Sequence, residues 1–154
     1  MLLANYFKYV TITAPLIKAV KQATGCICIE HNSSGEQPPY PFATYSITSP
    51  EITNQHDKEG SQFEVGLSLT FHDSSSISVL NLAKMCESFF DSQKGRAIFA
   101  ERDVVLAYTE NFDRRDNFIS IDYERLAGFD MRLRVAETFI DDVETIDNII
   151  IGGI

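Results

Sequence analysis

Histidine and cysteine are the residue types that could hold a metal in this chain. A helical zinc site needs histidines at positions i and i+4, or cysteine pairs spaced C-x-x-C. His31, His56 and His72 are far apart, and only one residue separates Cys26 from Cys28. The spacing therefore favours surface or capping roles for the histidines and free, buried thiols for the cysteines.

Serines and paired carboxylates offer no better catalytic pattern. The serines at 74–76 lie outside a G-x-S-x-G elbow, so nothing primes them as nucleophiles. Asp141 and Asp142 are adjacent and would point to opposite sides of a strand, which disfavours a shared proton. Cys86 falls on the apolar face of a predicted helix, and the sequence has no glycine-rich phosphate loop. We therefore expect neither an enzyme nor a bound metal or cofactor.

The charge balance argues against a nucleic-acid-binding role. The 154 residues include 13 Lys and Arg against 22 Asp and Glu, for a net charge of −9. Arg114 and Arg115 are flanked by Asp113 and Asp116, a mixture typical of a solvated or subunit-pairing face.

No apolar run reaches the ~20 residues that span a bilayer, and the first residues do not resemble a signal peptide. The odd number of cysteines indicates a reducing compartment, either the cytoplasm or a particle assembled there.

Hydrophobic spacing predicts two helices. Apolar residues recur at helical spacing over 12–24, and Gly25 provides a stop. The second helix is expected over 76–93, with N-cap candidates at 73–76, an apolar face that includes Cys86, and Gly95 as its end.

Strands are expected over 26–31, 40–48, 63–72, 104–112, 118–123 and 129–139. The segment 63–72 alternates most regularly between apolar and polar residues. Pro41 confines its strand to a sheet edge, or to a start after the proline. Polar loops are expected over 32–39 and 49–60, and a turn over 113–117.

Because strands outnumber helices and mostly follow one another, the predicted class is α+β. The sheet should be mainly antiparallel or mixed, with two helices packed on one face. The size allows one domain over 1–154, with a candidate N-terminal arm at 1–11 and a candidate C-terminal tail at 141–154.

Three segments are poorly explained by a lone monomer: the aromatic-rich 38–45, the glycine-containing strand entry at 124–130, and an acidic stretch that ends in isoleucines. Together with their neighbours they resemble the neck-terminator, or tail-terminator, proteins of long-tailed bacteriophages. The matching motifs, in chain order, are Pro39 to Tyr45, Leu69-Thr70-Phe71, Leu82-Ala83 with Phe89-Phe90, Arg125 with Gly128-Phe129-Asp130, and Val143 to Ile146 leading into Ile151-Gly152-Gly153.

The resemblance implies a structural virion protein without a cofactor or catalytic residue, assembled in the host cytoplasm. Such proteins cap the head-proximal end of the tail tube as a ring, usually of six subunits, which ends tube growth and joins the tail to the head connector. The expected partners are other copies of the chain, the tail-tube protein and connector or adaptor proteins. DNA would pass through without specific binding. The alternatives are a head-side adaptor or stopper and, in another class, a small α+β ligand-binding or enzyme-subunit domain.

Two groups of residues are candidates for these contacts. Interface candidates are the aromatic residues near the expected edge strand, three arginines and the terminal isoleucines: Tyr40, Phe42, Tyr45, Arg114, Arg115, Arg125, Ile149, Ile150 and Ile151. An acidic channel lining would repel the DNA duplex weakly and keep it centred. The candidates for that lining are Glu110, Asp113, Asp116, Asp141, Asp142, Glu144 and Asp147.

Overall fold

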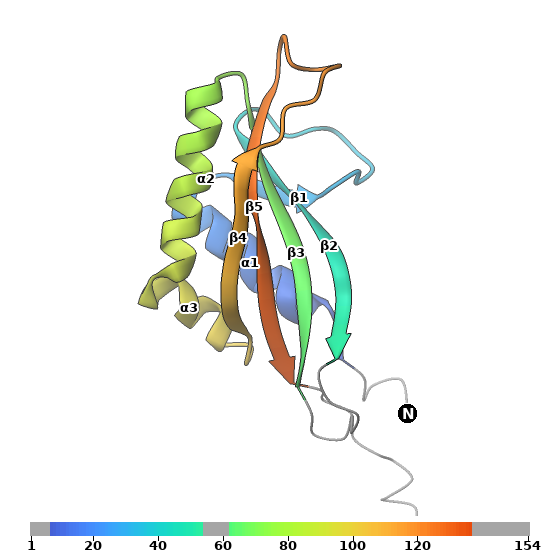
Figure 1. Ribbon diagram of the computed structural model, residues 1–154, viewed down its shortest axis with the longest axis vertical. Helices are drawn as coiled ribbons and strands as arrows, with labels where there is room; N and C mark the ends of the chain where they lie inside the picture. The colour runs from blue at the N-terminus through green and yellow to red at the C-terminus, as the bar shows by residue number, and fades with distance from the viewer. Residues whose placement is uncertain (1–6, 54–61, 137–154) are drawn as a thin grey trace, which may run out of the picture.

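Five strands form one sheet and three helices lie against it in residues 7–53 and 62–136, the parts of the chain that the computed structural model describes (Figure 1). The helices are α1 (Val10–Thr24), α2 (Ser76–Asp91) and α3 (Gln93–Ala100). The strands are β1 (Ile27–Glu30), β2 (Phe42–Thr53), β3 (Gln62–Asp73), β4 (Val105–Arg114) and β5 (Arg125–Ala136).

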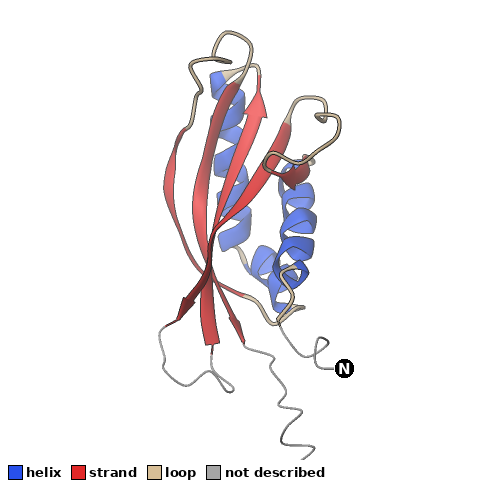
Figure 2. Ribbon diagram, turned by 90° about the vertical axis from the view of Figure 1, so that its right-hand side faces the viewer, coloured by secondary structure: helices blue, strands red, loops and turns tan. Residues whose placement is uncertain are grey.

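The strand order is β1-β2-β3-β5-β4. β1 runs parallel to β2, and the other neighbouring pairs are antiparallel. The helices all lie on one face of the sheet, and no described element covers the other face (Figure 2). The predicted α+β class with a mainly antiparallel or mixed sheet is therefore confirmed, with the sheet of the mixed kind.

A break between α2 and α3 corrects the expected single helix over 76–93 and the expected count of two helices. Ser92 is extended (φ −74°, ψ 162°), and its hydroxyl caps α3 by accepting a hydrogen bond from the backbone N–H of Gly95 at 3.1 Å. A Cβ on Gly95 would overlap the carbonyl oxygen of Phe89. The glycine therefore lets α3 turn closely against the end of α2, and it lies inside a third helix instead of ending the second.

Apolar side chains fill the space between the sheet and the helices. The alternating residues of β3 that face the helices are all buried: Phe63, Val65, Leu67, Leu69 and Phe71. Phe90 of α2 makes edge contacts with Phe99 and Phe129 at ring-centroid distances of 5.5 and 6.0 Å. The three cysteines are free and buried as predicted, and burial, with a smaller contribution from the neighbouring Cys26, raises the pKa of Cys28 to about 12.

The predicted ends of several strands are wrong, because contacts between strands determine where each strand begins and ends. β2 starts directly after Pro41, which confirms one of the two expected options, but it lies between β1 and β3 instead of at the sheet edge. Residues 49–53 were expected to begin a loop but belong to β2, which continues to Thr53. β4 continues through Arg114, beyond the expected start of the turn, and β5 begins at Arg125, four residues earlier than expected.

Residues 118–123 form turns and not the expected strand. The backbone N–H groups of Tyr123 and Glu124 both donate to the carbonyl oxygen of Ser120, at 3.0 and 2.7 Å. The N–H of Ile119 donates to the side chain of Asn117 at 2.9 Å. These local bonds replace the strand pairing that the F-I-x-I-x-Y pattern predicts.

Part of the candidate N-terminal arm packs on the fold. The ring of Phe7 contacts the ring of Phe63 edge-on at 5.2 Å, and α1 already begins at Val10. Residues 1–6, His56 and the candidate tail at 141–154 lie outside the described residues. Within the described part, we found no helix with the length and apolar character needed to cross a membrane.

Candidate assembly surfaces

An aromatic stack closes the end of the sheet where β2 starts. Phe42 of β2 and His72 of β3 are register partners, and their rings stack at 4.5 Å with an interplanar angle of 6°. Tyr40 stacks on the other side of Phe42 at 5.6 Å. Only 3% of Phe42 is exposed, so this interface candidate is a buried residue of the subunit, whereas Tyr40 stays accessible.

His72 is buried, which corrects the surface or capping role expected for it. Its Nε2 shares a 2.9 Å hydrogen bond with the hydroxyl of Thr44. Its Nδ1 lies 3.3 Å from Oε2 of Glu124, which also accepts a 2.9 Å hydrogen bond from the hydroxyl of Tyr40. We call Tyr40, Phe42, Thr44, His72 and Glu124 the His72 cluster. It joins β2, β3 and the connection from β4 to β5.

Burial lowers the pKa of His72, and the opposing effect of the Glu124 carboxylate is too small to reverse the shift. The unfolded chain then binds a proton more readily than the folded one as the pH falls below about 6.5. The stabilisation from neutral His72 is complete above that pH and is lost as the pH falls through the lowered pKa. We therefore expect the free energy of unfolding to decrease between about pH 7 and pH 5.

Urea unfolding of wild type and His72→Gln at several pH values checks this expectation. The variant should be less stable than wild type at neutral pH and should show a flatter pH dependence. His31→Gln is the comparison variant, because His31 is exposed and its charge is the smallest of the contributions to the lowered pKa of His72, and it should keep most of the wild-type dependence. If the free energy of unfolding of His72→Gln depended on pH as in wild type, His72 would not be the cause of this dependence.

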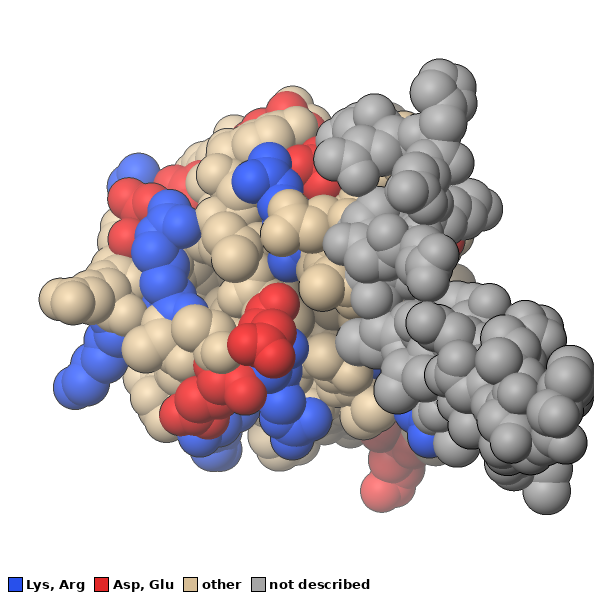
Figure 3. Space-filling model, turned by 90° about the horizontal axis from the view of Figure 1, so that it is seen from below, with Lys and Arg blue, Asp and Glu red and all other residues tan. Residues whose placement is uncertain are grey.

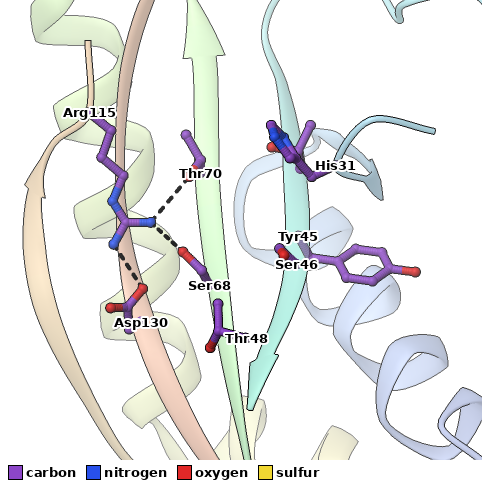
Figure 4. Close-up of a pocket in the computed structure, with 9 residues that line it drawn as sticks. His31, Tyr45, Ser46, Thr48, Ser68, Thr70, Arg115 and Asp130 are labelled. Atoms are coloured by element: carbon purple, nitrogen blue, oxygen red, sulfur yellow. Dashed lines mark hydrogen bonds and ion pairs between the residues drawn. The ribbon is translucent and has the colours of Figure 1, made fainter. Parts of the chain in front are cut away.

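Arg115 holds three strands together on the uncovered face of the sheet. Its side chain extends from the end of β4 across β5 and reaches β3, as Figure 4 shows. Nη1 donates to the hydroxyls of Ser68 at 2.6 Å and Thr70 at 3.2 Å. Nη2 and Nε donate to the carboxylates of Asp130 at 3.0 Å and Asp113 at 2.8 Å. This interface candidate is therefore bound within the subunit.

These contacts also affect the pKa of the Asp130 carboxyl group. Burial alone would raise the pKa of its carboxyl group, but hydrogen bonds from Asn111 and Arg115 outweigh the burial and hold the pKa below its usual value. The carboxylate is therefore charged near neutral pH and balances the guanidinium of Arg115. Asp113 makes a second ion pair with that guanidinium.

A polar hollow of about 480 Å³ lies beside Arg115 (Figure 4). It is lined mainly by hydroxyl side chains, which come from β2 and β3: Thr44, Ser46, Thr48, Ser68 and Thr70. Tyr45 points away from Arg115 in Figure 4, and its side chain is partly buried against the core. Such a surface can bind water or polar groups. No three His, Cys, Asp or Glu side chains in the described residues are grouped to hold a metal ion.

Asp116 and Arg125 close the base of the connection between β4 and β5. The guanidinium of Arg125 donates to both carboxylate oxygens of Asp116, at 3.2 and 3.0 Å. The backbone N–H of Leu126 donates to the same carboxylate at 3.0 Å. The hydrogen bonds from Arg125 are the main reason why the pKa of Asp116 is lowered. A channel-lining candidate and an interface candidate thus bind each other.

The other charged candidates are more accessible. Arg114 is exposed and donates to the hydroxyl of Ser76 at the start of α2. Glu110 and Asp113 are exposed on β4. The remaining candidates lie outside the described residues: Asp141, Asp142, Glu144, Asp147, Ile149, Ile150 and Ile151.

The edge strand β4, and the part of β2 that the four-residue edge strand β1 leaves uncovered beyond Tyr45, are poorly suited to pair with another strand. β4 pairs with β5 through two register irregularities, and Asn111 has a left-handed backbone (φ 56°). Arg96 of α3 also donates to the carbonyl oxygen of Leu106 at 2.7 Å. β2 beyond Tyr45 contains Pro50 and two irregularities. Bulges and edge prolines discourage strand addition, so side-chain contacts are the better candidates for assembly.

An exposed apolar group lies on the connection between β4 and β5, where the sequence pattern predicted a half-buried strand. Phe118 is 96% exposed and Ile119 is 87% exposed, and Ile121 and Tyr123 are also accessible. In the sequence, the turn formers Asn117 and Ser120 beside these residues are the feature that argues against a buried strand.

At the other end of the molecule, seen from below in Figure 3, the visible basic and acidic side chains are interspersed.

A family model described as phage neck terminator protein matches residues 14–154. The matched range includes the His72 cluster, Arg115 with its partners, and the exposed apolar group on the β4–β5 connection. None of the curated proteins matches the chain.

Proposed function

Because the chain belongs to the phage neck terminator family, we propose that it forms a ring that caps the head-proximal end of the tail tube. The family indicates a structural protein of the virion neck with a role in tail completion, and it implies contacts with other tail or head-tail proteins. In our proposal the ring ends tube elongation and provides the surface that joins the tail to the head connector. The family match over residues 14–154 is the observation that carries the proposal.

The surface of the subunit supports assembly through side chains. Head-to-tail contacts between unlike surfaces close into rings when the rotation between neighbours closes. Irregular strand edges disfavour a continuous intersubunit sheet, whereas Tyr40 and Arg114 remain accessible for contacts between copies. Tyr45 is partly buried and therefore offers less surface for contacts between copies. Arg115 and Arg125 are bonded within the subunit and hold the surface residues around them in position.

Light scattering tests ring formation. A ring of six chains of 17.3 kDa would have a mass of about 104 kDa. The protein alone should reach this mass, or added tail-tube protein should gain about this mass when the ring forms on it. A monomer at every concentration, even with tube protein present, would contradict the ring. Binding to connector protein but not to tube protein would instead favour a head-side adaptor or stopper.

A ring on the tail axis must let DNA pass, and we expect the protein to bind duplex DNA negligibly. The net charge is −9, and Glu110 and Asp113 are exposed channel-lining candidates. Asp116 contributes less repulsion because Arg125 neutralises it. Charge repulsion of this kind acts over about 8 Å at physiological salt.

A mobility-shift assay at low salt should therefore show no complex at micromolar protein. A basic DNA-binding protein run in parallel confirms that the duplex can be shifted. A salt-sensitive shift with this protein would contradict the expectation, since it would require a cluster of free basic side chains.

A further inference from the structure

An apolar crest stands at one end of the molecule. We define the crest as Phe118, Ile119, Ile121 and Tyr123, which lie on the connection between β4 and β5 at the top of Figure 1. Phe118 and Ile119 are almost fully exposed, and grouped apolar side chains with this exposure mark a contact with a partner. Asp122 lies among them, is exposed, and makes no hydrogen bond or ion pair with another described residue. The crest therefore offers a partner apolar side chains beside one unpaired carboxylate.

The backbone beneath the crest is held in place. Arg115 and Asp116 fix the N-terminal side of the connection through their bonds to Asp130 and Arg125. The carbonyl oxygen of Ser120, in the middle, accepts two backbone hydrogen bonds. Because the connection is already ordered, it loses less conformational entropy when it binds.

A small hollow between α1 and α3 has the complementary character. We call it the α1–α3 hollow, and it is lined by Ala14, Pro15, Lys18, Ile98, Glu101 and Arg102. Its floor is apolar, because Pro15 and Ile98 are buried and Ala14 is half-buried. Its volume is about 80 Å³. Since one buried water needs about 10–15 Å³, the hollow has room for the end of one apolar side chain.

Exposed apolar side chains continue from the hollow along α1. Val10, Ala14 and Ile17 are spaced i, i+4 and i+7, so they share one face of the helix. Val10 is 58% exposed and Ile17 is 40% exposed. Two apolar side chains of a crest can therefore be covered together, one in the hollow and one on this face of α1.

Cations stand beside the floor of the hollow. Lys94 lies four residues before Ile98 on α3, and Arg102 lies four residues after it, so the two cations flank the floor. Both are exposed, and neither side chain makes a hydrogen bond or ion pair with another described residue. Lys18 pairs with Glu101 at 3.6 Å, but both side chains are more than half exposed, so this pair is weak. The unpaired carboxylate of a crest thus has unpaired cations to meet at the hollow.

The crest and the hollow lie toward opposite ends of the subunit. Arg114 at the end of β4 donates to Ser76, which places the start of α2 beside the base of the crest. α2 then runs for 16 residues, about 24 Å, before α3 begins. Figure 1 shows the crest above the upper end of α2 and α3 at its lower end. The crest therefore cannot reach the hollow of its own chain, and a contact between them joins two copies head to tail.

The larger hollows on the described surface match the crest less well. They are lined largely by hydroxyl and charged side chains. One of them carries Glu30, Glu36 and Glu124, which would repel Asp122. Each copy has a net charge of −9, but charges act over only about 8 Å at physiological salt. The local pairing of Asp122 with the cations at the α1–α3 hollow therefore outweighs the repulsion between whole copies.

We infer that the crest of one copy docks into the α1–α3 hollow of the next copy. This inference rests on the proposed function, in which copies of the chain form a ring, and it identifies the contact that joins them. Phe118 and Ile119 cover the hollow and the neighbouring face of α1, and Asp122 faces the cations beside the floor. A head-to-tail contact of this kind between unlike surfaces closes into a ring when the rotation between neighbours closes.

Sedimentation equilibrium of the full chain at physiological salt tests the contact. The crest variant Phe118→Ser/Ile119→Ser should self-associate at least about tenfold more weakly than wild type, because central apolar anchors carry much of the affinity of an interface. The matched control is Ile77→Ser/Met85→Ser, which removes two apolar side chains that are 65% and 51% exposed on α2. The control should associate like wild type.

Variants of the hollow should weaken self-association as strongly as the crest variant. Ala14→Glu places a carboxylate over the floor, where it excludes the apolar side chains and repels Asp122. Arg102→Glu reverses a cation at an exposed position, so it tests the same contact without altering a packed side chain. The control for the added carboxylate is Ala100→Glu, since Ala100 is exposed on α3 and lies two residues from Ile98, on another face of the helix. It should associate like wild type.

A mixture of the crest variant and a hollow variant gives the sharpest result. The crest variant keeps an intact hollow, and the hollow variant keeps an intact crest, so one contact can form between them. Where each variant alone is a monomer, we expect the mixture to form a complex of two chains of 17.3 kDa, about 35 kDa, that does not grow further. Formation of this complex also shows that both variants are folded.

The outcomes separate the inference from the proposed function. Wild type that stays monomeric up to about 1 mM, crest or hollow variants that associate like wild type, or a mixture that stays monomeric would each overturn the inference. A control variant that weakens association as much as the crest variant would overturn it as well. The proposed function fails separately, if wild type remains a monomer even with tail-tube protein present.

Discussion

Replacing Gly128 by alanine is expected to lower the free energy of unfolding by about 3 kcal/mol or more. Gly128 of β5 pairs with Thr70 of β3 and with Asp113 of β4. A Cβ at this position would overlap the backbone carbonyl of Leu69 and lie 2.9 Å from the Cα of Thr70. Since backbone atoms of a central strand cannot move aside without breaking the sheet, β3 and β5 would have to separate locally.

Gly66 provides a matched control for this prediction. It lies on β3 in the same sheet, and a Cβ there would meet the side chain of Ser49 at 3.1 Å and no backbone atom among its nearest contacts. Gly66→Ala should therefore be much less damaging, because a serine side chain can shift. Urea unfolding followed by circular dichroism measures both variants. Equal stability of Gly128→Ala and Gly66→Ala would show that the close approach at Gly128 is unimportant.

Replacing Arg115 by methionine is expected to lower the free energy of unfolding by about 2–3 kcal/mol, in line with the loss of a largely buried, hydrogen-bonded charge. The side chain of Arg115 is 19% exposed, and its removal leaves Asp113 and Asp130 without this cation. The hydroxyls of Ser68 and Thr70 lose a donor as well. Methionine keeps most of the length of the side chain, so the effect reports mainly on the lost bonds.

Two further variants sharpen this test. Arg115→Lys should recover only part of the stability, because one ammonium group cannot reproduce the fork of the guanidinium. Arg102→Met is the control, since Arg102 is exposed and makes no described side-chain hydrogen bond. Hydrogen exchange should also become faster in the connection between β4 and β5 in Arg115→Met. Wild-type exchange and stability in that variant would rule out Arg115 as the residue that positions the connection.

Local patterns predicted the fold where burial alone decides it. The strict alternation from Phe63 to Phe71 predicted a half-buried strand, and β3 is that strand. Gly25 was expected to stop the first helix and does so with a left-handed backbone (φ 77°). The break at Ser92 was missed, because helical periodicity continues on both sides of it. Residues 118–123 were predicted to form a strand because their apolar residues alternate as in a strand, but these residues lie in an exposed turn.

The candidate surfaces were less predictable, because their contacts join residues that are distant in sequence. The neighbours Asp113 and Asp116 were visible beside Arg115, but Ser68 and Asp130 reach it only through the sheet register. His72 is likewise buried in contact with Phe42, Thr44 and Glu124, which are distant from it in sequence. The resemblance to neck-terminator proteins is confirmed by the family model, whereas the interface and channel residues stay predictions.

The central claim is that the protein ends tail-tube growth by capping the head-proximal end. Electron microscopy of tail-tube protein polymerising with and without this protein tests it most directly. We expect added protein to appear as a ring at one end of each tube and to stop elongation at that end. Tubes that grow equally long with both ends bare, in the presence of excess properly folded protein, would contradict the account.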